Sequence, residues 1–153
     1  MRKASTNAIV NDLILKHLLL ERKLRPQKVL LLTSSSVGSY IEDVADERII
    51  EQTEKNAKNE VVREAFTDAS GKLTTQSIID SMKLMREVDE VEHGNEKVLI
   101  LSHYGGHKWA LSEETFWKTL FASVGVGANS SHDDNIVIFR LSNNQLKSNA
   151  TFH

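Results

Sequence analysis

Three short segments of the chain are apolar along their length and polar at both ends. They span residues 28–33, 97–102 and 136–141. An apolar run of this length is too short for an ordinary helix and is typical of a strand buried on both faces. We therefore predict three strands here. The side chains that we expect in the core are Leu31, Leu99, Leu101, Val137 and Phe139.

Helical periodicity separates these strands, because apolar residues recur there at spacings of three and four. The predicted helices span residues 5–24, 41–49 and 74–88, and a fourth begins at Ser112, a good N-cap with Glu113 and Glu114 after it. The polar segments 90–96 and 124–131 are predicted as loops. Residues 60–70 fit either a short strand or a continuation of the preceding helix.

Apolar strands that alternate with amphipathic helices predict a three-layer α/β/α sandwich with a mainly parallel sheet. We expect one domain over residues 1–142 and a flexible polar tail over 143–153. Ligands of such sheets bind beyond the carboxyl ends of the strands. The first two strands end in the loops 33–39 and 103–107, so we expect these loops to share one edge of the sheet and to form the functional site.

Composition narrows the class of protein. The 153 residues carry 19 Lys and Arg against 21 Asp and Glu, a net charge of −2, which argues against nucleic acid as a partner. The absence of cysteine excludes disulfides and thiol catalysis, and it favours a reducing compartment. No apolar run is long enough to span a membrane, and polar residues interrupt the stretch that follows Arg2 and Lys3. We expect a cytoplasmic protein with neither a membrane span nor a signal peptide.

Two loops carry candidate chemistry. Ser35 follows a strand and precedes a helix, where its hydroxyl could act as a nucleophile beside backbone N–H groups that bind an oxyanion or a phosphate. His103 and His107 flank a Gly-Gly pair, and either is a candidate general base. The ligand-binding groups that we assign are Ser34, Ser36, Gly38, Gly71, Gly105 and Gly106. A helix-capping serine turn and surface histidines are the alternative interpretations. Neither a metal nor a cofactor is predicted.

The order of these features resembles the SGNH (GDSL-type) hydrolases, serine esterases and lipases on a flavodoxin-like, Rossmann-like fold. Residues 30–35 look like the family's first block, with Ser35 in the nucleophile position. Residues 69–75 look like the second block and residues 99–108 like the third. The resemblance implies ester hydrolysis at Ser35. Thr33-Ser34 stands where the family has Gly-Asp, and His107-Lys108 stands where it has Asn-Asp.

Two phosphatase families show other resemblances. Residues 98–106 resemble the second-histidine block of the histidine phosphatase superfamily, and residues 35–38 resemble its Ser-Pro block. Asp133-Asp134-Asn135 is similar to a motif of metal-dependent serine/threonine phosphatases. Both resemblances imply phosphoester chemistry.

Two functions follow from the sequence. One is a hydrolase of a small ester or phosphoester, with Ser35 as nucleophile and His103 or His107 as base. The alternative is a non-catalytic protein-binding or assembly module, which the departures from the catalytic motifs favour. The leucines of the predicted helix 5–24 cover more than one stripe, so this helix would hold a protein partner or a second copy.

Overall fold

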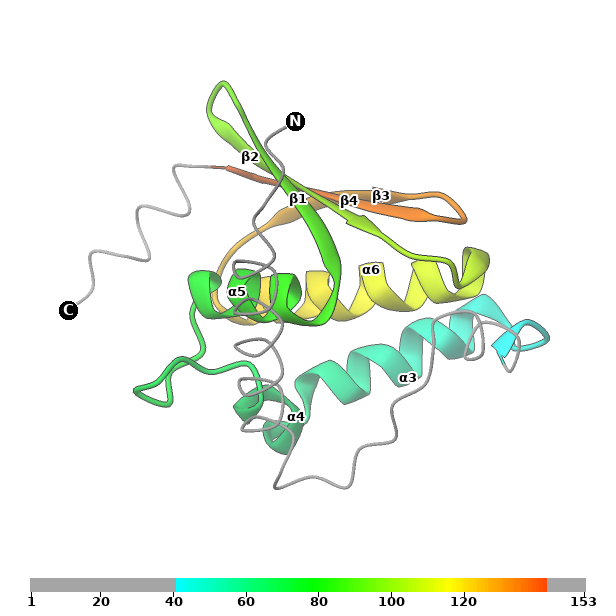
Figure 1. Cartoon of the computed structure of the whole chain (residues 1–153). Helices are drawn as coiled ribbons and strands as arrows, with labels where there is room; N and C mark the ends of the chain where they lie inside the picture. The colour runs from blue at the N-terminus through cyan, green and yellow to red at the C-terminus, as the bar shows by residue number, and fades with distance from the viewer. Residues whose placement is uncertain (1–40, 143–153) are drawn as a thin grey trace, which may run out of the picture. The chain divides into compact units, whose positions relative to one another are not determined.

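A computed structural model describes residues 41–142, all of which belong to one compact unit of the chain. In chain order the elements are α3 (Asp46–Lys58), α4 (Glu60–Glu64), α5 (Thr75–Met85), β1 (Glu87–His93), β2 (Glu96–Ser102), α6 (Gly106–Ser123), β3 (Ala128–His132) and β4 (Ile136–Ser142) (Figure 1). The predicted helix 5–24, the predicted strand 28–33 and the predicted tail 143–153 lie outside the described residues.

The described strands form one sheet in the order β1-β2-β4-β3. Each neighbouring pair is antiparallel, and Leu99 of β2 lies opposite Phe139 of β4. The prediction of a mainly parallel, flavodoxin-like (Rossmann-like) sheet is therefore wrong for residues 41–142. The predicted strands 97–102 and 136–141 do form, as β2 and β4.

The lengths of the connections explain why the sheet is antiparallel. Gly94 and Asn95 alone join β1 to β2, and Gly94 has a φ of 60°, which suits the first central position of a two-residue hairpin turn. The turn between β3 and β4 is held by Asp133 Oδ1, which accepts the backbone N–H groups of Asn135 and Ile136 at 2.8 and 2.9 Å. Turns this short can join only antiparallel strands.

The two strands that the sequence pattern missed, β1 and β3, lie at the edges of the sheet. Their residues are mostly polar, and β1 is exposed along nearly its whole length. Charged side chains on an edge strand hinder pairing with other chains, so an apolar pattern is not needed there. The segments 90–96 and 124–131 were predicted as loops for this reason. That prediction is wrong for the strand residues 90–93, 96 and 128–131, and it is confirmed for the turn 94–95 and the loop 124–127.

One face of the sheet packs on α5 and α6, and this interface is the core. Leu99, Leu101, Val137 and Phe139 are completely buried there, which confirms their predicted burial; Leu31 lies outside the described residues. The helices contribute the completely or almost completely buried side chains Ile78, Ile79, Met82, Trp117, Leu120 and Phe121. Helix α3 packs against α6 (Figure 1). No helix among residues 41–142 is both long and apolar enough to cross a membrane.

The observed helix boundaries differ from the predicted ones at two points that concern function. Helix α5 starts with a capping box between Thr74 and Ser77, but it ends at Met85 because β1 begins two residues later. Helix α6 begins at Gly106 instead of Ser112, so His107 and Lys108 lie in its first turn. The ambiguous residues 60–70 begin with the short helix α4.

Candidate active site

The predicted base His103 lies directly after β2 and is almost completely buried, with 3% of its surface exposed. Its Nδ1 accepts the backbone N–H of Gly105 at 3.2 Å, and its own backbone N–H donates to Asn135 O at 2.8 Å. Since the N–H of Gly105 is already donated to His103, this group is not free to stabilise an oxyanion. His103 anchors the β2–α6 loop to the β3–β4 turn.

Glycine is required for structural reasons at both positions of the Gly105-Gly106 pair in this loop. A Cβ at Gly105 would lie 2.3 Å from Trp109 Cγ, which leaves no room for a side chain. Gly106 begins α6 with a φ of 74°, in the region that favours glycine.

Gly71, the remaining predicted ligand-binding residue in 41–142, is not brought to His103. Gly71 has a φ of 79° in a turn after α4 whose backbone hydrogen bonds go to Asp68. Figure 1 places the α4–α5 loop at the opposite end of the helices from the start of α6. Ser34, Ser35, Ser36 and Gly38 lie outside the described residues.

Burial decides the charge state of His103. Desolvation lowers the pKa of its imidazole, and the positive charge of Arg86 acts in the same direction. The carboxylates of Glu113 and Asp133 oppose this shift and do not cancel it. Among the described residues the buried Nε2 has no hydrogen-bond partner. His103 is thus a buried neutral imidazole that accepts through Nδ1.

Stability should therefore fall as the pH drops. The unfolded chain protonates this histidine near the ordinary pKa of ~6.5, whereas the lowered pKa of the folded His103 keeps it neutral, so below ~6.5 the unfolded state binds more protons. We expect the unfolding free energy in urea to decrease from about pH 7.5 to about pH 5, and to decrease less in His103→Asn, whose amide oxygen still accepts from Gly105. Parallel pH dependences in the two proteins would contradict the assignment.

His107, the second predicted base, belongs to a different cluster. Its Nε2–H donates to Asp46 Oδ2 at 3.3 Å, and Lys108 Nζ donates to the other oxygen of the same carboxylate. Asp46 is the first residue of α3, and these two hydrogen bonds hold the pKa of its carboxyl below the ordinary value. The side chain of His107 is about half exposed.

A second imidazole with its own carboxylate stands beside His107. His132, the last residue of β3, donates Nδ1–H to Glu114 Oε2. Ser130 Oγ donates to Glu114 Oε1 at 2.6 Å, so both carboxylate oxygens are held. The side chains of His132 and Glu114 are only 17% and 16% exposed, which fixes the ring more firmly than the surface ring of His107.

The two rings are neighbours, and we call His107 and His132 the histidine pair. Their centroids lie 5.3 Å apart and their planes are inclined by 42°. Because Nε2 of His107 and Nδ1 of His132 are bound to carboxylates, the remaining nitrogens are Nδ1 of His107 and Nε2 of His132. A nitrogen held by a carboxylate fixes the tautomer and orientation of the ring, as general acid–base catalysis requires.

Sequence reasoning found His107 and missed its partners Asp46, Glu114 and His132. His107 and Glu114 are seven residues apart, so they share one face of α6, and that signal was hidden because the helix was expected to begin at Ser112. His132 was assigned no role from the sequence. Asp133 closes the β3–β4 turn, and the two backbone N–H groups that it accepts lower the pKa of its carboxyl.

A partly buried ion pair supports α6 at Glu113, the residue before Glu114. Glu113 Oε1 accepts Nε and Nη2 of Arg86 at 3.1 and 2.6 Å, and Glu113 Oε2 accepts the indole N–H of Trp117 at 2.7 Å. The guanidinium carbon of Arg86 also lies 5.4 Å from the ring centroid of Trp109. Glu113 and the neighbouring Glu114 therefore differ in role: Glu113 ties α6 to the end of α5, and Glu114 holds His132.

Residues 41–142 contain no group of three or more histidine, aspartate or glutamate side chains placed to hold a metal ion. No protein-family model matches the chain, and no curated protein matches it. These comparisons therefore do not test the resemblances to SGNH hydrolases and to phosphatases.

Proposed function

We propose that this protein is a hydrolase of phosphoester bonds in small molecules and that the histidine pair supplies its general acid and general base. The observation that carries the proposal is that two adjacent imidazoles, 5.3 Å apart, are each held by a carboxylate of their own. Such a pair offers one ring nitrogen to take a proton and another to give one. A histidine that is merely exposed on the surface does not require a carboxylate to fix the orientation of its ring.

The roles follow from burial and hydrogen bonding. His132, fixed by Glu114, is the base: its Nε2 takes a proton from a water molecule whose oxygen forms a bond to phosphorus. As the bond from phosphorus to the leaving oxygen breaks, protonated His107 gives a proton from Nδ1 to that oxygen. Asp46 and Glu114 act as positioning residues. Lys108, in the same cluster, provides a cation for the phosphoryl oxygens.

The composition of the sequence supports a cellular compartment and a substrate size for this activity. We place it in the cytoplasm because the chain contains no cysteine, as is common in proteins of reducing compartments. The net charge of −2 favours small phosphoesters over long nucleic acids as substrates.

The test is hydrolysis of thymidine 5′-(para-nitrophenyl phosphate), a chromogenic diester with one negative charge, compared with para-nitrophenyl acetate. We expect the wild-type protein to cleave the phosphodiester and His132→Asn to lose about 100-fold or more in kcat, the usual contribution of a general base. His93→Asn is the matched control, because His93 is an exposed histidine at the end of β1, outside the cluster. Thermal unfolding of each variant shows whether it folds.

Ser35→Ala separates this mechanism from the one that the SGNH resemblance implies. With water as nucleophile the variant keeps its activity, whereas loss of activity would make Ser35 the nucleophile. If the wild-type protein cleaves neither substrate, the hydrolase proposal fails and the protein-binding or assembly module becomes the working hypothesis.

A further inference from the structure

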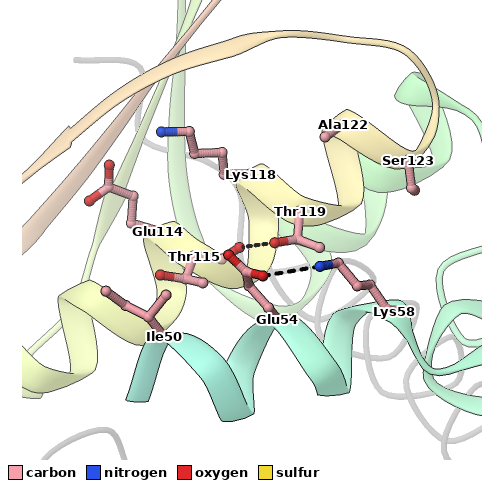
Figure 2. A pocket seen from close by; sticks show the side chains of 9 residues that line it. All are labelled: Ile50, Glu54, Lys58, Glu114, Thr115, Lys118, Thr119, Ala122 and Ser123. Carbon is pink, nitrogen blue, oxygen red and sulfur yellow. Dashed lines mark hydrogen bonds and ion pairs between the residues drawn. The ribbon is translucent and has the colours of Figure 1, made fainter. Parts of the chain in front are cut away.

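A groove lies between α3 and α6 (Figure 2). It has a volume of about 630 Å³ and is lined by Ile50, Glu54 and Lys58 of α3 and by six residues of α6 between Glu114 and Ser123. Glu114 belongs to both places, since it lines the groove and also holds His132. The groove therefore adjoins the carboxylate that holds the proposed base.

The groove contains two lysines with different surroundings. Lys58 is paired with Glu54 at 3.0 Å across one turn of α3. Lys118 is exposed and makes no ion pair with any residue in 41–142. It lies one turn after Glu114 on the same face of α6, and Figure 2 shows both side chains extending in the same direction from the helix. Among residues 41–142, Lys118 is thus the cation of the groove that has no ion-pair partner, and its Cα lies about 6 Å further along the helix axis than that of Glu114.

We propose that Lys118 binds a second anionic group of the substrate and that the preferred substrates are phosphoesters with a further phosphate on the part that is not the leaving group. This inference rests on the proposed function. The reacting phosphoryl group takes the place beside the histidine pair, and the second phosphate lies in the groove against Lys118. The hydroxyl group of Thr115, which also lines the groove, is a further hydrogen-bond donor.

A matched pair of diesters tests this inference. Thymidine 5′-(para-nitrophenyl phosphate) carries one anionic group, and its derivative with an added 3′-phosphate carries two, with the same leaving group. We expect the wild-type protein to show about tenfold higher kcat/KM for the second compound, mainly through KM, because an exposed ion pair contributes about 1 kcal/mol or somewhat more with phosphate. Lys118→Gln should remove this preference, so that kcat/KM becomes nearly equal for the two compounds.

Lys72→Gln is the charge-matched control, since Lys72 lies in the α4–α5 loop away from the groove. The preference should persist in this variant and should weaken at high salt in the wild type. Equal kcat/KM values for the two diesters, or a preference that survives Lys118→Gln, would overturn the role of Lys118 and leave the hydrolase proposal standing. No hydrolysis of either diester by the wild type would overturn both.

Discussion

Replacing Glu113 by leucine should lower the free energy of unfolding by about 2–3 kcal/mol, the cost of removing the acceptor of charge-assisted hydrogen bonds from a partly buried ion pair. The variant leaves the guanidinium of Arg86 and the indole N–H of Trp117 without their acceptor inside the protein. Both side chains of the ion pair are well shielded, with Arg86 25% and Glu113 8% exposed. Urea unfolding at neutral pH, followed by tryptophan fluorescence, measures the loss.

Two further variants show whether the loss comes from an orphaned charge. The double variant Arg86→Leu/Glu113→Leu should be more stable than Glu113→Leu alone, because no unpaired guanidinium remains. Glu54→Ala breaks the exposed pair with Lys58 and should cost less than about 1 kcal/mol. A loss below 1 kcal/mol in Glu113→Leu would show that this carboxylate does not hold the end of α5 to α6.

Replacing His107 by glutamine should reduce kcat by about 10²–10⁴-fold on a phosphodiester with an alkyl leaving group, such as dithymidine monophosphate. The same variant should lose only a few-fold on the para-nitrophenyl diester. An alkoxide needs a proton as it leaves, whereas para-nitrophenolate is stable as an anion and leaves without one. A general acid is therefore important for the first substrate and nearly dispensable for the second. Chromatography of the released nucleoside measures the alkyl case.

The contrast with His132 makes this prediction specific. His132→Asn should lose activity on both substrates, because both need the base that activates water. His93→Asn should lose on neither. If His107→Gln lowers kcat by the same factor on the two diesters, His107 is not the general acid and has a structural role in the site instead.

Several features of the fold could be read from local pattern. The short apolar runs that became β2 and β4 were predicted from their length and polar flanks, and the burial of Leu99 and Phe139 followed from the same reasoning. The hairpin turn at Gly94-Asn95 carried a sequence signal as well, although the charged residues around it concealed the strand β1. Strand direction was mistaken because two central antiparallel strands are as apolar as parallel ones.

The candidate site was only partly predictable. His107 stood out because it follows a strand and a pair of glycines. Its neighbour His132 is 25 residues further along the chain than His107, and Asp46 is 61 residues before His107. No local spacing links such residues, since only the packing of α3 against α6 and of α6 against β3 brings them together.

The sequence by itself determined that the segments 97–102 and 136–141 enter the core, because burial follows from apolar side chains and their pattern along the chain. It also determined the residue types available for acid–base chemistry and excluded thiol chemistry through the absence of cysteine. Only the tertiary structure decided that the sheet is antiparallel, that His103 is a buried anchor, and that His107 pairs with His132. The reason is physical: strand order, desolvation and contacts between distant side chains depend on how elements pack in space, and local pattern does not encode that packing.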